Sequence, residues 1–160
     1  RVVGVNAQIA SQSGTSSGVG FAIPANVVRR VVPSLIETGS YAWPWLGVQG
    51  GAVNLLVQEA NDLEAQNGAY IAAVVQNGPA DEAGLRGATG EAQILGQTVP
   101  VGGDVVIRAD GEEIQDFADL LSVVAFKRPG DTVSLTILRD GAEEEVPVNL
   151  AARPSEFGRQ

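Results

Sequence analysis

Two short runs of apolar residues separated by a polar stretch open the chain, a pattern typical of β-strands. Val2, Val3, Val5 and Ile9 predict one strand over residues 2–9, and Val19 to Ile23 predict a second. Between them, Ser11–Gly18 is rich in serine, glycine and glutamine, which predicts a flexible loop.

Apolar spacing changes to a helical period after this pair of strands. We expect a helix over Val27–Glu37, with Asn26 as its N-cap and Gly39 just past its end. Pro33 should kink this helix or restrict it to a short second turn, because proline lacks the N–H group that a helix interior uses. Residues 39–44 are then a short linker.

Short apolar runs and turn signals continue over residues 45–150 and predict a second unit. Asp110-Gly111 and Asp140-Gly141 are typical of tight turns between paired strands. The predicted elements are a helix over Val53–Leu63, a strand over Ala69–Val75, a short helix over Pro79–Leu85, a hairpin arm within Glu91–Val101, a strand over Asp104–Arg108, a helix over Asp116–Lys127 capped by Asp116, and a hairpin of Thr132–Leu138 with Glu144–Leu150. The domains are expected at residues 1–38 and 45–152, with a tail at 153–160.

The composition excludes several kinds of site and partner but says little about the fold. The 160 residues contain no histidine and no cysteine, so the chain alone holds no Ser-His-Asp relay and no thiolate metal site. We therefore expect no catalytic residue, no metal and no cofactor in it. The net charge of −9 and the scattered basic residues argue against a nucleic-acid partner. No signal peptide and no bilayer-length apolar run is visible.

Two local patterns imitate catalytic motifs. Gly14–Gly18 matches Gly-x-Ser-x-Gly, but that motif requires a preceding strand, a following helix and a downstream histidine, so we interpret it as a polar loop. Glu112-Glu113 and Glu143–Glu145 flank tight turns, where carboxylates are solvated. We interpret both acidic clusters as surface residues.

Four stretches, in this order, resemble the PDZ domains of bacterial proteases. They are Trp45-Leu46-Gly47-Val48, Gly78-Pro79-Ala80 through Ala83-Gly84-Leu85, Gly103-Asp104-Val105-Val106 and Arg128-Pro129-Gly130-Asp131. The resemblance implies an α+β, mostly β fold: an antiparallel β-sandwich of the PDZ type capped by two helices. The stretch Gly87–Gly102 is an insert relative to that pattern.

PDZ domains bind the C-termini of peptides, so the resemblance implies a binding groove. Backbone N–H groups of Leu46, Gly47 and Val48 would hold the terminal carboxylate, and the peptide would add as a strand beside this segment. The implied groove residues are Trp45, Gln49, Phe117, Leu121 and Val124. For each helix residue we favour core packing over peptide contact, and Leu120 and Val123 are expected in the core. A groove without charged lining would prefer an aliphatic last residue.

The segment before the linker resembles the end of an HtrA-family serine protease domain, a trypsin-like β-barrel. The resemblance rests on Val5-Asn6-Ala7-Gln8-Ile9 and on Gly20-Phe21-Ala22-Ile23-Pro24. It implies that Asn6 and Ile9 are a remnant of the protease substrate cleft, and that Ala10–Gly18 corresponds to a regulatory loop. The family's Gly-Asn-Ser-Gly-Gly nucleophile motif is missing, so no catalytic role passes to any residue here.

We therefore expect a C-terminal fragment of an HtrA-like serine endopeptidase, inactive alone, whose PDZ domain captures substrate or regulates the protease. The family implies an extracytoplasmic location in the bacterial periplasm or cell envelope. Implied partners are protein or peptide C-termini with an apolar last residue and the rest of the protease domain. A hairpin cut from its barrel would pack on the PDZ unit or exchange with a second chain, giving a homo-oligomer.

Two other interpretations remain open from the sequence. The chain could be a stand-alone PDZ adaptor, although Arg1 is no initiator residue, or the PDZ domain of another protease class. The strand Gly20–Pro24, followed by a helix and then the PDZ-like unit, favours the HtrA family over both.

Overall fold

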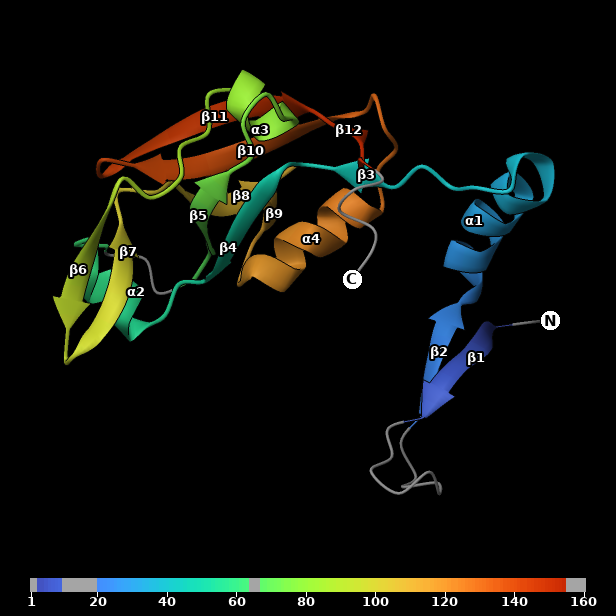
Figure 1. Ribbon diagram of the computed structural model, residues 1–160, viewed down its shortest axis with the longest axis horizontal. Coiled ribbons are helices and arrows are strands. Elements are labelled where there is room, and N and C mark those ends of the chain that lie inside the picture. The colour runs from blue at the N-terminus through green and yellow to red at the C-terminus, as the bar shows by residue number, and fades with distance from the viewer. Residues whose placement is uncertain (1–2, 10–19, 64–66, 155–160) are drawn as a thin grey trace. The chain divides into compact units, whose positions relative to one another are not determined.

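The computed structural model describes residues 3–9, 20–63 and 67–154 (Figure 1). Its internal contacts divide the chain into two compact units, Arg1–Tyr41 and Ala42–Gln160. The predicted linker at residues 39–44 contains the boundary between them.

The first unit is a hairpin followed by a helix. Strands β1 (Gly4–Ile9) and β2 (Gly20–Pro24) pair antiparallel, with an irregularity of register between Asn6 and Gln8. Helix α1 (Ala25–Thr38) follows β2 directly. The predicted loop Ser11–Gly18 lies outside the described residues.

Helix α1 corrects two details of the prediction. Its N-cap is Pro24 and not Asn26, because the chain enters the helix through a main-chain bond in which the Ala25 N–H donates to the Val3 carbonyl at 3.0 Å. Pro33 lies inside the helix, which continues to Thr38, so this proline does not end it. Gly39 ends the helix as predicted, in a left-handed conformation with φ +73°.

The second unit is built on one antiparallel sheet. Its strands are β4 (Val48–Ala52), β5 (Ala69–Val74), β8 (Val105–Ala109), β9 (Glu112–Glu113), β10 (Thr132–Arg139) and β11 (Ala142–Asn149). The order across the sheet is β11-β10-β8-β5-β4, with β9 paired to β8. Strand β4 therefore lies at an edge of the sheet, with one side of its backbone not covered by another strand.

Three short helices accompany this sheet. Helix α4 (Phe117–Ala125) contacts β4, β5 and β8, whereas α3 (Pro79–Glu82) contacts β11 (Figure 1). Helix α2 (Leu55–Ala60) is shorter than predicted, because Asn54 caps it by accepting from the N–H groups of Leu56 and Val57. Helix α3 ends before Leu85, with Ala83 as its C-cap.

Two small ladders complete the second unit. The insert forms a hairpin of β6 (Gly90–Ile94) and β7 (Gln97–Val101), which contacts α2. Strands β3 (Pro44–Trp45) and β12 (Ala151–Ala152) pair antiparallel. The sequence did not predict this second ladder, because two dipeptides far apart in the chain carry no periodic signal. Residues 155–160 of the predicted tail lie outside the described part.

The hydrophobic core lies within the second unit, between its mostly β framework and the helices that pack on the sheet. The larger cluster of buried side chains includes Ile71, Leu120, Val133, Leu135, Ile137 and Val148, and the smaller one Val53, Val57, Tyr70, Val99 and Val105. Leu120 is fully buried and Val123 packs against the same cluster, as expected. In residues 3–7 and 21–40, no side chain is buried.

One ion pair is buried beside this core. Asp104, only 1% exposed, accepts from Nε and Nη2 of Arg139 at 2.8 and 2.7 Å. It also accepts from the Arg86 N–H group at 2.7 Å, and Arg139 donates to the Gly84 carbonyl at 2.8 Å. The acidic residue of the Gly103–Val106 stretch is therefore structural: it joins the loop after α3 to the start of β8 and the end of β10.

Candidate functional site

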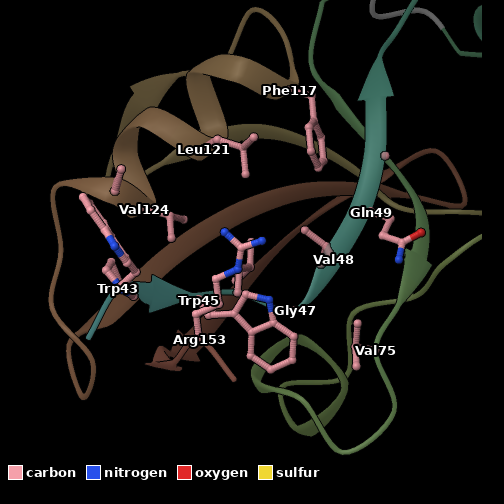
Figure 2. A pocket seen from close by; sticks show the side chains of 14 residues that line it. Trp43, Trp45, Gly47, Val48, Gln49, Val75, Phe117, Leu121, Val124 and Arg153 are labelled. Atoms are coloured by element: carbon pink, nitrogen blue, oxygen red, sulfur yellow. The ribbon is translucent and has the colours of Figure 1, made fainter. Parts of the chain in front are cut away.

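A half-open cavity of about 570 Å³ lies between the edge strand β4 and helix α4 (Figure 2). All eight residues that the sequence predicts for the carboxylate loop and the groove line this one cavity. The full lining is Trp43, Pro44, Trp45, Leu46, Gly47, Val48, Gln49, Gly50, Val75, Phe117, Leu121, Val124, Ala125 and Arg153.

The loop between β3 and β4 presents unused hydrogen-bond donors. Its carbonyls are engaged: that of Leu46 accepts from Ala80 N–H at 3.0 Å, and that of Gly47 from Val75 N–H at 2.8 Å. Within the described part of the chain, the N–H groups of Leu46 and Gly47 donate to no backbone carbonyl. Adjacent unpaired N–H groups are what an anion-binding loop requires.

Gly47 has a conformation that other residues adopt only with strain. Its φ of +81° lies in the left-handed region, which glycine enters without steric penalty. The Trp45 ring packs close by, because a Cβ atom added at Gly47 or at Gly78 would meet it at 3.4 Å. Trp45 therefore supports the loop from the side of α3.

The backbone of the edge strand β4 is closely packed at Gly50. Gly50 leaves no room for a side chain, since an added Cβ atom would lie 1.9 Å from the Tyr70 carbonyl and 2.9 Å from the Phe117 ring. The register between β4 and β5 shifts between Gln49 and Gly50. Phe117 therefore packs against the strand backbone at the end of the cavity away from Gly47 (Figure 2).

Helix α4 divides its apolar residues between the core and the cavity. Asp116 fixes the start of the helix by accepting from Ala118 and Asp119 N–H groups at 2.8 and 3.0 Å. Leu121 is 48% exposed, whereas Val124 is only 4% exposed. Val124 belongs to the core cluster and also lines the cavity, so packing and lining are not alternatives at this position.

Two lining residues were missed by the sequence prediction. Trp43 was placed in the linker and Arg153 in the tail, yet the pairing of β3 with β12 brings both to the cavity. The Arg153 N–H group donates to the Trp43 carbonyl at 2.8 Å. The expectation of a groove without charged lining is therefore wrong, because Arg153 contributes a guanidinium group. Only the strand pairing, which the sequence does not signal, could have placed it.

The remaining sequence candidates lie elsewhere. Asn6 and Ile9 are both in β1, where Asn6 is exposed and pairs with Ala22. The Gly14–Gly18 pattern lies outside the described residues. All five glutamates of the two acidic clusters are exposed, as expected, and three of them hydrogen-bond to neighbouring side chains. In the described ranges, no group of acidic side chains is arranged to hold a metal ion.

A family model for the PDZ domain matches residues 45–150. The chain belongs to the PDZ domain family. The match covers β4 to β11, the three helices of the second unit and most of the cavity lining, whereas Trp43, Pro44 and Arg153 lie outside it. The edge strand β4 and helix α4 are the two walls of the cavity in this PDZ domain.

Curated relatives and solved structures extend the likeness beyond the PDZ domain. A probable periplasmic serine endoprotease, DegP-like, from Brucella suis is 35% identical over 99% of this chain, and one from Rhizobium meliloti is 37% identical over 97%. The chain spans 28% of the length of each. The solved structure of the HtrA-type protease AlgW with decapeptide matches 96% of this chain and 42% of its own, at 33% identity and a TM-score of 0.72. The expected resemblance to the HtrA family is therefore confirmed.

None of the helices in the described residues is both long and apolar enough to cross a bilayer.

Proposed function

We propose that the PDZ domain of this chain binds peptide C-termini that end in an apolar residue. The observation that supports it best is the unused edge of β4, which runs to a loop with two unpaired N–H groups at Leu46 and Gly47. A peptide added antiparallel to β4 gains main-chain hydrogen bonds along the edge, and its carboxylate reaches the loop. Its last side chain enters the apolar cavity beside Leu121 and Val124.

Alternation along the added strand sets which peptide side chains face the helix. Side chains of successive residues point to opposite faces, so the last and third-last residues both face α4. Leu121 and Val124 lie along the middle and end of α4, and Phe117 begins it. Apolar residues at both peptide positions therefore fit this wall, with Arg153 near the carboxylate end.

For the whole protein, we propose an HtrA-like serine endopeptidase of the bacterial periplasm or cell envelope, of which this chain is one part. Similarity to DegP-like proteases over both units supports this proposal against a stand-alone adaptor and against another protease class. The chain itself contains no histidine, so hydrolysis would need residues outside it. Peptide capture by the PDZ domain would then deliver substrate or regulate the protease.

Exposed apolar side chains in the first unit favour the rest of that protease domain as its partner. Apolar side chains of the β1–β2 hairpin are exposed, with Val5 at 46%, Phe21 at 53% and Ile23 at 42%. A two-stranded hairpin alone is marginally stable in water, and further strands would cover these side chains.

The test is a calorimetric titration of the full chain with two peptides that share an aliphatic last residue, one with a free carboxylate and one with a C-terminal amide. We expect micromolar binding of the acid and at least about tenfold weaker binding of the amide, because a charge-assisted hydrogen bond is lost. Leu121→Asp should abolish binding, whereas the matched variant Leu95→Asp, at the exposed tip between β6 and β7, should bind normally. Equal binding of both peptides, or normal binding by Leu121→Asp, would overturn the proposal.

A further inference from the structure

The hairpin of β6 and β7 ends in a turn whose first residue is uncommon for its conformation. Leu95 and Gly96 join the two strands with φ values of +50° and +78°, as in a turn of type I′. That turn prefers asparagine or aspartate followed by glycine, because both of its residues are left-handed. In the described part of the chain, every other non-glycine residue with a positive φ is aspartate or asparagine: Asp62, Asn77, Asp110 and Asp140. The backbone therefore disfavours leucine at this position.

The side chain of Leu95 is also exposed to solvent. Its exposed fraction is 85%, and no other large apolar side chain that the structure describes is more exposed. Both the turn conformation and the solvent would favour asparagine here, so this leucine does not stabilise the chain that carries it. An exposed apolar side chain on a disfavoured backbone conformation indicates a surface that contacts another molecule.

A second exposed leucine lies toward the same end of the hairpin. Asn61, the C-cap of α2, donates to the Pro100 carbonyl at 3.1 Å and accepts from the Gly102 N–H group at 2.9 Å. These bonds join the end of α2 to the base of the hairpin, so the start of α2, which carries Leu55, lies toward the turn (Figure 1). Leu55 is 74% exposed. We call Leu55 and Leu95 together the arm patch.

The surroundings of the arm patch are acidic. The chain has no lysine or arginine over residues 31–85 or over residues 87–107. Glu59, Asp62 and Glu91 lie in or directly beside α2 and the hairpin, and all three are exposed. Within the described ranges, none of the three forms an ion pair. An apolar patch with an acidic rim repels a second copy of itself and an anionic lipid surface, and it attracts a cationic partner.

We infer that the arm patch binds a cationic amphipathic segment of a partner protein. Apolar side chains of that segment cover the two leucines, and its lysine or arginine side chains lie against the three carboxylates. Burial of the leucines supplies affinity, whereas the charge pairs supply orientation and speed of association. Neither leucine lines the groove between β4 and α4, so this surface is separate from the proposed site of peptide capture.

The test adds an end-blocked amphipathic peptide of leucine and lysine to the full chain. Its C-terminal amide removes the carboxylate that the groove is proposed to bind. We expect the peptide to shift the backbone amide resonances of Leu55, Glu91 and Leu95 in NMR spectra. In calorimetry it should bind at least about tenfold more tightly than a matched peptide of leucine and glutamate. Binding should weaken as salt concentration rises, because salt screens the charge pairs.

The variant Leu95→Asn separates docking from folding. It should weaken binding of the lysine peptide about tenfold, since the burial of one leucine side chain is lost. It should also raise the urea midpoint, because asparagine adopts the left-handed conformation more readily than leucine. The matched control Phe126→Asn removes another exposed apolar side chain, beyond the end of α4, and should bind the lysine peptide normally. Leu121→Asp, which tests the groove, should also bind it normally, so the two proposals can fail separately.

Three results would overturn this inference directly. They are equal binding of the two peptides, unchanged binding by Leu95→Asn, and resonance shifts centred on another acidic surface such as Glu143–Glu145. A dimer in sedimentation that Leu95→Asn dissociates would also overturn it, because the arm patch would then bind a second copy of the chain. Binding to phosphatidylcholine vesicles that Leu95→Asn abolishes would assign the patch to a lipid surface instead.

Discussion

At the scale of single residues, Gly47 combines a left-handed backbone conformation with a proposed role in peptide binding. Its φ of +81° is one that alanine adopts only with strain, and its N–H group is one of the two donors of the loop. Gly111, in the turn after β8, has nearly the same φ of +83°, and a Cβ atom there would meet nothing within 4 Å. The two glycines thus share a left-handed conformation but lie at different places in the fold.

We expect Gly47→Ala and Gly111→Ala each to lower the free energy of unfolding by about 1 kcal/mol, the cost of a left-handed alanine. Only Gly47→Ala should also weaken binding of the acid peptide, because the loop must shift to relieve its strain. Urea unfolding and calorimetry measure the two effects. Unchanged peptide binding by Gly47→Ala would separate the loop conformation from recognition.

The buried pair of Asp104 and Arg139 predicts the largest loss of stability from one polar substitution. Asp104→Asn leaves the Arg139 guanidinium without its buried anion, and we expect a loss of about 3–5 kcal/mol in urea unfolding. Glu144, which is exposed and also accepts from Arg139, is the matched control: Glu144→Gln should cost less than about 1 kcal/mol. Similar losses for both variants would show that burial does not decide the contribution.

One surface ion pair should make the stability of the fold depend on pH. Lys127, as ion-pair partner, lowers the pKa of the Asp110 carboxyl below its ordinary value of 3.8. A carboxyl with a lower pKa in the folded state stabilises the fold above its unfolded pKa and loses that contribution as pH falls through the folded pKa. Asp110→Asn should therefore unfold at lower urea than wild type at pH 7, and the difference should shrink as pH falls below 3.8 and through the lower folded pKa. A difference that does not shrink on acidification would exclude the ion pair as its cause.

At the scale of elements, α4 matters because it is one wall of the groove, and its start is set by a side-chain cap. Helix α2 has a cap of the same kind at Asn54, but it packs against the β6–β7 hairpin. Asp116→Ala and Asn54→Ala should each lower the free energy of unfolding by about 1 kcal/mol. Only Asp116→Ala should also weaken peptide binding, since it loosens the end of α4 that carries Phe117. Equal effects of both variants on binding would point to global stability and not to the helix wall.

The elements also show what the sequence can predict. The Asp110-Gly111 and Asp140-Gly141 turns have the positive φ values that their residues favour, and Asp116 caps α4, because these signals are local. Asn26 failed as a cap because a main-chain bond from Ala25 fixes the entry to α1. The prediction missed Arg153 as a lining residue because its position depends on the β3–β12 pairing, which joins residues more than a hundred positions apart. Local chemistry was predictable, and long-range pairing of very short strands was not.

At the scale of the whole molecule, the distribution of buried residues predicts where stability lies. Both core clusters begin at or after Leu46, and none of the residues 3–7 and 21–40 is buried. We expect a chain that begins at Ala42 to unfold at the same urea midpoint as the full chain and to bind the acid peptide equally well. A lower midpoint for the shorter chain would mean that the first unit contributes to the stability of the PDZ domain.

The most direct test of the central claim follows backbone amides by NMR as each peptide is added to the full chain. The account predicts that the free-acid peptide shifts the Leu46 and Gly47 amide resonances strongly and protects the amides of the β4 edge from exchange with solvent. The amide-terminated peptide should produce much smaller shifts at the same two residues. Shifts centred away from the groove, for example at the polar cavity near Asn61 and Arg86, would contradict the account.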